Sequence, residues 1–259
     1  MANKKSFELK EDIDEKLRKK TITTVFILSL IVLVIALIFI WIKYEVEGTK
    51  GLSFEIEEFL IISTADGRRI ENKNKKVKTD KFEVSQVNDI YIKIKEKDLI
   101  QSDLSLNKII ITNFVLEKKP EKGEILVLEP TGSMPELFIN STKNYLDKAI
   151  EYKGSKVDNL EKLETSEKGG TIAFRIENKL GDYSVKKDEV LKYDSSLLNK
   201  FTKSLEEIQF IINFDIIIEL ENGNKYSTNI RLEKPNEKIF TENKTVITED
   251  VSEMGFKKI

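Results

Sequence analysis

The hydrophobic pattern first marks a long apolar helix near the N-terminus. From Thr21 to Ile42, 22 consecutive residues carry no charge, and most are Ile, Leu, Val or Phe. A helix of that length rises about 33 Å, which matches a bilayer hydrocarbon core of about 30 Å. A core helix of a soluble domain would show a polar stripe at the helical period, and this segment has none. Residues 21–42 are therefore predicted to form a transmembrane helix.

The flanks of this helix favour a permanent anchor over a cleaved signal. A signal peptide has a shorter apolar region, of about 7 to 15 residues, and a small-residue cleavage site. Here the apolar run ends at Trp41 and Ile42 and is followed by Lys43 and Tyr44. The rings of Trp41 and Tyr44 suit the headgroup boundary. The tail of residues 1–20 contains the basic residues Lys4, Lys5, Lys10, Lys16, Arg18, Lys19 and Lys20. By the positive-inside bias, we expect a cytoplasmic N-terminus and an external remainder in a single-pass, signal-anchor protein of the cell membrane.

The tail itself has a helical pattern. Leu9, Ile13 and Leu17 follow one another at i, i+4 steps, and Ser6 can serve as the N-cap. An amphipathic helix is therefore predicted over Phe7–Lys20. It would lie against the lipid surface or dock a cytoplasmic partner, and both alternatives stay open.

After a linker at 43–51, residues 52–235 have the pattern of strands separated by polar loops. In Asp89–Lys95, three isoleucines alternate with Tyr and Lys, which is typical of an antiparallel sheet with one face in a core. The expected strands are Phe54–Ser63, Asp89–Lys95, Lys108–Glu117, Glu124–Glu129, Thr171–Glu177, Ile208–Leu220 and Tyr226–Leu232. The predicted fold class is a mainly-β, antiparallel β-sandwich region, either one large sandwich or two tandem Ig-like sandwiches with a seam near 130–135.

The hairpin around Asn222-Gly223 permits a register prediction. A two-residue type I′ turn there would set even-numbered residues opposite odd-numbered ones. The apolar residues of both strands are even-numbered, and residues that face each other across a ladder must point the same way. A three-residue loop, with Gly223 left-handed in a G1 bulge, restores parity. We therefore predict that Ile218 lies opposite Tyr226 and Phe214 opposite Ile230.

Smaller elements follow from turn and capping residues. Turns are expected at Asp66-Gly67, at 118–124 and at Gly169-Gly170, and a helical turn is expected after a cap at Asp194 or Ser195. The pattern of Tyr145–Tyr152 fits a short helix or a strand. The polar C-terminal segment, 236–259, contains "TVITE" and is expected to add a last strand.

Composition narrows the chemistry. The chain has no His and no Cys, which removes Ser-His-Asp and Cys-His nucleophilic sites, ordinary zinc sites and any disulfide framework. It also lacks a glycine-rich phosphate loop and a calcium loop of the Asp-x-Asp-x-Asp-Gly type. We therefore nominate no catalytic, cofactor-binding or metal-binding residue, and we expect no cofactor and no enzymatic role.

Charge gives weak information about partners. Lys and Arg number 43 and Asp and Glu 45, without a concentrated basic face, which argues against a nucleic-acid partner. The basic run Arg68–Lys81 is expected to be a solvated loop, with contact to anionic headgroups or wall polymers as the alternative. Only five basic residues are Arg, and this bias, with abundant Ile, Asn and Lys, is typical of an AT-rich bacterial genome.

Several segments resemble known proteins. The segments "KYEVEG", "LSFEIEEFLIISTADG", "NDIYIKI", "ITNFVLEKKPEKGEI", "GGTIAFRI" and "FKKI" resemble a set of uncharacterised single-pass bacterial membrane proteins with a short basic cytoplasmic tail and a β-rich extracytoplasmic domain. This resemblance covers almost the whole chain and implies a topology but no activity. "VEGTKGLSFEIEEF" is similar to the start of the extracytoplasmic domain in division scaffolds of the DivIB type. In those scaffolds a helix follows "VEG", whereas the pattern here is that of a strand.

The sequence thus predicts a membrane-anchored extracytoplasmic binding, assembly or structural module of the bacterial cell envelope. The bilayer would hold residues 21–42, and an envelope protein or wall polymer would be the partner, with edge strands as contact surfaces. One alternative is a carboxylate-only glycan-processing enzyme, which needs two Asp or Glu about 5 to 10 Å apart in a cleft. Another is an accessory subunit of a membrane complex, in which Ser29 and Ala36 would pack against a partner span.

Overall fold

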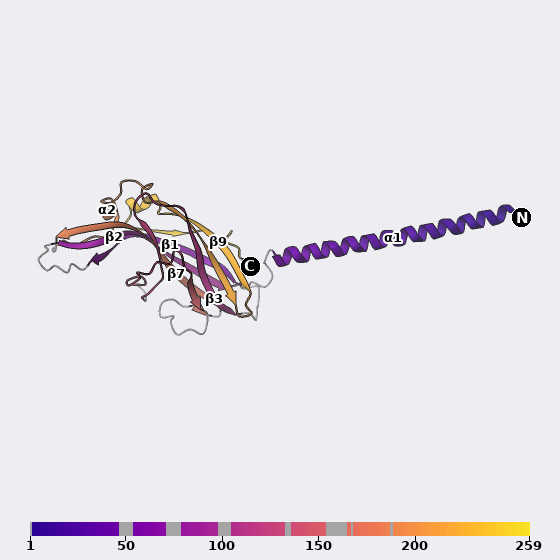
Figure 1. The fold of residues 1–259 in the computed structure, drawn as a ribbon, viewed down its shortest axis with the longest axis horizontal. Coiled ribbons are helices and arrows are strands. Elements are labelled where there is room, and N and C mark those ends of the chain that lie inside the picture. Colours follow the sequence, from indigo (N-terminus) through magenta and orange to yellow (C-terminus); the bar gives the residue numbers. More distant parts are fainter. Residues whose placement is uncertain are drawn as a thin grey trace. The chain divides into compact units, whose positions relative to one another are not determined.

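The structure is a computed structural model that describes residues 2–46, 54–70, 79–97, 105–132, 136–153, 165–166, 168–186 and 189–259. The chain divides into two compact units, Met1–Lys50 and Gly51–Ile259. The first unit consists of one helix, α1 (Ala2–Val46), and the second is mainly antiparallel β-structure in two sheets (Figure 1). The coarse prediction of an N-terminal apolar helix followed by a mainly-β part is confirmed.

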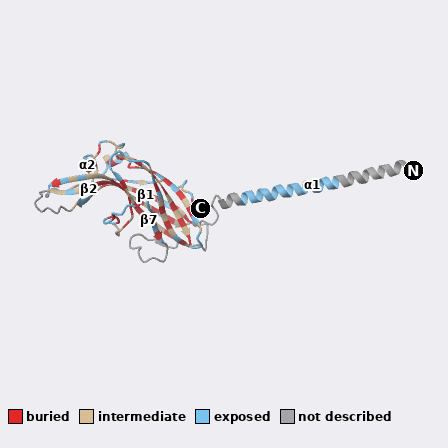
Figure 2. Cartoon of the chain, in the orientation of Figure 1, coloured by how far each residue is buried: buried red, intermediate tan, exposed pale blue. Residues whose placement is uncertain are grey.

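Helix α1 is continuous through the predicted tail helix and the apolar segment. Its stretch Arg18–Trp41 is long and apolar enough to cross a membrane, and none of its most apolar part is buried (Figure 2). The hydroxyls of Thr23, Thr24 and Ser29 donate to backbone carbonyls three or four residues earlier, so these polar groups have partners within the helix. The helix extends into the expected linker, of which residues 47–51 lie outside the described residues.

All seven predicted strands are present, and most are longer than predicted. The described strands are β1 (Phe54–Ile70), β2 (Thr79–Glu96), β3 (Leu106–Lys118), β4 (Glu124–Leu128), β5 (Ile150–Lys153), β6 (Thr165–Ser166), β7 (Gly169–Lys186), β8 (Phe210–Leu220), β9 (Lys225–Lys234), β10 (Lys244–Thr248) and β11 (Lys257–Lys258). Two short helices, α2 (Ser195–Leu198) and η1 (Glu237–Phe240), lie between strands in the sequence.

The strands form two sheets, and each sheet contains strands from both the first and the second half of the β unit. In the described residues, sheet A has the order β10-β1-β2-β7-β4 with β6 beside β7, and sheet B has the order β11-β9-β8-β3-β5. The neighbouring strands are antiparallel. The seam expected near 130–135 lies partly outside the described residues, which omit 133–135.

The two sheets share one hydrophobic core. Phe174 of β7 contacts Phe114 of β3 and Phe214 of β8, with ring centroids 5.9 and 5.2 Å apart. Burial alternates along the strands (Figure 2), and the isoleucines at 90, 92 and 94 of β2 are all buried, as predicted. Each such large side chain contributes about 1.5–3 kcal/mol when it leaves water.

The predicted β8–β9 register is correct. Ile218 lies opposite Tyr226 and Phe214 opposite Ile230. Gly223 has φ 81°, the left-handed conformation expected of it, and the amide of Leu220 donates to the carbonyl of Asn224 at 3.0 Å. The parity of buried positions therefore fixed the loop length correctly.

The predicted turn at Asp66-Gly67 is wrong, because β1 continues to Ile70 and pairs with β2 along that length. The Asp66 carboxylate does accept the Gly67 amide at 2.7 Å, which is a local bond common in turns. Gly67 has a different role, since a Cβ there would lie 2.6 Å from the ring of Tyr193. The glycine permits this close approach within a strand.

The remaining small elements resolve the open alternatives. Asp194 rather than Ser195 caps α2, with its side chain accepting the Ser196 amide at 2.9 Å. In Tyr145–Tyr152, turns precede the start of strand β5, and the expected last strand is β10, which pairs with β1. Gly169 and Gly170 begin β7 and pair with both β2 and β6. Residues 119–123 connect sheet B to sheet A.

Glu207 stabilises this connection by hydrogen bonds. Its carboxylate accepts bonds from Lys122 at 2.8 Å and from the Thr202 hydroxyl at 2.6 Å. These bonds and the amide of Lys203 hold the pKa of Glu207 at about 2, below its ordinary value of 4.5. A carboxyl whose pKa is depressed by folding stabilises the fold above its unfolded pKa and loses that contribution as pH falls.

We predict that Glu207→Gln removes this acid-dependent stabilisation. The stability difference between wild type and variant should be complete above pH 4.5 and should disappear as the pH falls to about 2. Denaturant unfolding across that pH range measures it, with Glu221→Gln in the exposed hairpin loop as the control. A difference independent of pH would contradict the assignment.

Candidate functional site

A cavity of about 410 Å³ lies against the face of sheet A that points away from the shared core, called the outer face below. Strand alternation explains its lining. Phe174 and Ile176 of β7 point into the core, so Arg175 and Glu177 point to the outer face, as does Asp89 of β2 beside buried Ile90. Residues 136–139, after β4, line the cavity as well.

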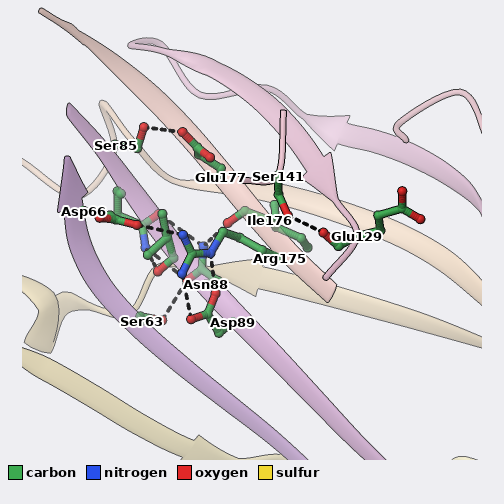
Figure 3. A network of polar contacts seen from close by, with 12 residues as sticks. Ser63, Asp66, Ser85, Asn88, Asp89, Glu129, Ser141, Arg175, Ile176 and Glu177 are labelled. Atoms are coloured by element: carbon green, nitrogen blue, oxygen red, sulfur yellow. Dashed lines mark hydrogen bonds and ion pairs between the residues drawn. The ribbon is translucent and has the colours of Figure 1, made fainter. Parts of the chain in front are cut away.

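Arg175 is the centre of the site (Figure 3). Its Nε donates to Asp89 Oδ1 at 2.5 Å and its Nη2 to Asp89 Oδ2 at 3.0 Å, while Nη1 donates to Asp66 Oδ2 at 2.7 Å. The pairing with Asp89 is bidentate, which adds directional specificity to the charge attraction. The guanidinium carbon also lies 4.7 Å from the centre of the Phe138 ring, a cation–π contact.

Burial controls the electrostatics of this cluster. The side chains of Arg175 and Asp89 are 14% and 17% exposed, whereas that of Asp66 is 45% exposed. Burial alone would lower the pKa of Arg175, but the bonds and charges of Asp89 and Asp66 outweigh it and raise that pKa. Burial raises the pKa of Asp89, and its contacts with Arg175 oppose the rise. The arginine thus stays charged and forms ion pairs with both aspartates.

Glu177 and Ser85 form a second polar pair in the cavity. The Ser85 hydroxyl donates to Glu177 Oε1 at 2.5 Å, and Glu177 is 6% exposed (Figure 3). Among the ion pairs between described residues, none includes Glu177. The cavity therefore holds a carboxylate whose bond in this structure is to a neutral hydroxyl.

The described residues 129–132 and 136–141 form a strap over the outer face. Leu137 and Phe138 pack on Ala173 and Tyr91, and the Leu137 carbonyl accepts the amides of residues 131 and 132 at 2.8 and 2.9 Å. Arg68 donates to the Ser141 carbonyl at 2.8 Å, which ties the end of the strap to β1. Side-chain and backbone contacts thus both hold the strap at the cavity.

A row of paired residues crosses sheet A at the level of Arg175. Val246 of β10 lies opposite Ile62 of β1, Ile62 opposite Asp89 of β2, Asp89 opposite Arg175 of β7, and Arg175 opposite Leu128 of β4. The cavity and the β10 edge therefore belong to one outer surface.

The sequence did not single out these residues. The pattern nominates no site residue, and it places Asp66 in a turn and Arg68 in a solvated loop. The one available signal was Arg175, a rare arginine inside the strand pattern "TIAFRIE". Of the basic run 68–81, Arg68 and Arg69 belong to β1, with Arg69 bonded to Asp80 at 2.7 Å, and residues 71–78 lie outside the described residues.

The cavity is suited to bind a polar ligand. Arg175 and the two aspartates are bound to one another, so the groups left to contact a ligand are the Glu177 carboxylate, other hydrogen-bonding groups of the lining, and the rings of Phe138 and Tyr91. Within the described residues, no group of three or more acidic side chains is placed to hold a metal ion. A scan against protein-family models finds no family that matches this chain, and searches of curated proteins and of solved structures find no match.

We predict that Arg175→Leu destabilises the β unit by about 3–5 kcal/mol, because it leaves the buried Asp89 carboxylate without compensation. Arg231→Leu is the matched control, since its ion pair with Glu117 is about half exposed and should contribute less than about 1 kcal/mol. Urea unfolding followed by fluorescence of the β unit's tyrosines compares the two. Equal losses would show that Arg175 is not a structural centre.

Proposed function

We propose that this protein is a single-pass membrane protein whose β unit is an extracytoplasmic binding, assembly or structural module of the bacterial cell envelope, without a catalytic role. The observation that carries the proposal is that the apolar stretch Arg18–Trp41 is exposed, whereas the β unit buries a hydrophobic core of its own. An apolar surface of this extent requires cover by lipid or protein. Its length and uniform apolarity favour the bilayer.

The basic residues of the tail support a cytoplasmic N-terminus, and the length of the apolar stretch supports retention as a signal anchor. The shared core of Phe114, Phe174 and Phe214 supports the finer fold assignment, two sheets stacked as an Ig-like β-sandwich.

The cavity on the outer face supports a binding role. It combines buried polar groups with the exposed apolar side chain of Ile139, which is 56% exposed, so a partner can gain both hydrogen bonds and apolar contact. Asp66 and Asp89 both bind Arg175, which argues against these two residues as the acid pair of a glycan-processing enzyme. An envelope protein or wall polymer is the proposed partner.

The topology predicts a labelling pattern that the cysteine-free chain makes simple to read. Val190, which is 86% exposed, lies in the β unit, and Lys4 lies in the tail. A membrane-impermeant maleimide should label Val190→Cys in intact cells and Lys4→Cys only after permeabilisation. The reverse labelling pattern would contradict the topology, and a β unit that is shorter than 29.9 kDa and released from the membrane would contradict the retained anchor.

Partner binding at the cavity predicts site-specific crosslinking. In the full-length protein, Ile139→Cys carrying a photoreactive maleimide should crosslink in cells to an envelope component. Val115→Cys on β3 is the matched control, because Val115 is similarly exposed, at 58%, and belongs to sheet B. Products identified by mass spectrometry should be enriched at 139, and equal products at both positions would argue against a cavity partner.

A further inference from the structure

The edges of the two sheets differ in how they are protected from pairing with other chains. Exposed strand edges commonly carry charges, bulges or covering segments that prevent such pairing. The β4 edge is covered, because Val127 accepts the Tyr145 amide at 2.7 Å and donates to the Asn144 side chain at 3.0 Å. This edge of sheet A is therefore closed to a partner strand.

The edges of sheet B are protected in other ways. Strand β11 pairs with the start of β9, and the rest of that strand has exposed polar side chains at Asn229, Arg231 and Glu233. Strand β5 has four residues, two of them charged, and beyond it β3 is interrupted by bulges, with Asn113 at φ 55°. Neither edge presents a regular apolar ladder.

Strand β10 is the exception among the described edges. The Glu249 amide donates to the Phe59 carbonyl directly opposite at 2.9 Å, so the backbone groups of odd-numbered residues in β10 face β1. Those of Lys244, Val246 and Thr248 consequently face away from β1. This edge has no bulge against β1 and no proline, and its sequence KTVIT is rich in β-branched residues.

The side chains on this edge are also apolar at its centre. Val246 is 57% exposed and lies opposite the half-buried Ile62, with half-buried Leu60 diagonal to it on the outer face. A strand added at β10 would cover this apolar strip and satisfy the outward backbone groups together.

We propose that β10 pairs with β10 of a second copy of this chain, antiparallel and centred on Val246, so that sheet A continues from one copy into the other. Val246 then lies opposite Val246 of the second copy, and Lys244 lies opposite Thr248. Such a contact is isologous and closes as a two-fold dimer.

Charge complementarity identifies a second copy as the occupant. The strand begins at Lys244 and is followed by Asp250, and both residues are exposed, whereas Glu249 is bound by Lys234 of its own chain at 2.6 Å. Antiparallel pairing centred on Val246 sets Lys244 of each copy diagonal to Asp250 of the other, at both ends of the contact. Parallel pairing in register would place Lys244 against Lys244, which is unfavourable.

Disulfide trapping in the full-length protein tests the register directly, because the native chain has no cysteine. In a hydrogen-bonded antiparallel pair the Cα atoms are about 5.5 Å apart, within the range that a disulfide bridges. Under mild oxidation in membranes, Val246→Cys should form covalent dimer at least about tenfold faster than Val115→Cys, whose exposure of 58% is similar. Equal rates for the two variants would overturn the proposal.

A second pair of variants separates loss of pairing from loss of fold. Lys244→Cys and Thr248→Cys, expressed together, should form a heterodimer that exceeds either homodimer. Adding Val246→Pro removes an outward amide that β1 does not use, so the heterodimer should be lost while the thermal unfolding midpoint of the β unit is retained. A heterodimer that survives Val246→Pro would exclude β10 pairing.

Discussion

Because successive side chains of a strand point to opposite faces, β7 contributes to two environments at once. Phe174 holds sheets A and B together through its contacts with Phe114 and Phe214. Its neighbour Arg175 occupies the outer face and binds aspartates from β1 and β2. The core therefore fixes the height and direction of Arg175, and a shift of β7 by one residue would exchange the two environments.

The Arg175 cluster is a directional constraint more than a source of stability. Removing these charges from water costs much of the free energy that their attraction returns, so the net contribution of the intact cluster is small. Removing Arg175 alone is destabilising for a different reason, because it leaves the buried Asp89 without its partner. Its geometry is selective, because the bidentate contact with Asp89 requires one register between β2 and β7. The same guanidinium lies against Phe138 and so links this register to the position of the strap. The register of β2 with β7 and the position of the strap therefore together determine the shape of the cavity.

Much of the β unit was predictable from local pattern. The alternation in Asp89–Lys95 predicted which side of β2 is buried, and parity between Ile218 and Tyr226 predicted the loop between β8 and β9. The pattern could not indicate that β10 pairs with β1, because the two strands are far apart in the sequence and the polar residues near them have no distinguishing period. Asp66 and Arg175 are 109 residues apart, and each alone resembles a solvated charge. The Asp66-Gly67 error has the same origin, since the ring of Tyr193 that requires the glycine comes from a distant segment.

The row of paired residues from Val246 to Arg175 determines how far apart the two cavities would lie in a dimer joined at β10. Adjacent strands are about 4.8 Å apart, so in a two-fold pair joined at β10 seven strand spacings separate the two Arg175 residues, about 34 Å along the sheet. An antiparallel two-fold is perpendicular to the sheet, so both cavities open on the same side. A polymeric or repeating ligand could engage both, and the second contact would then form at the high effective concentration set by the first. Two sites that each bind weakly can then give the dimer a high overall affinity for such a ligand through avidity alone.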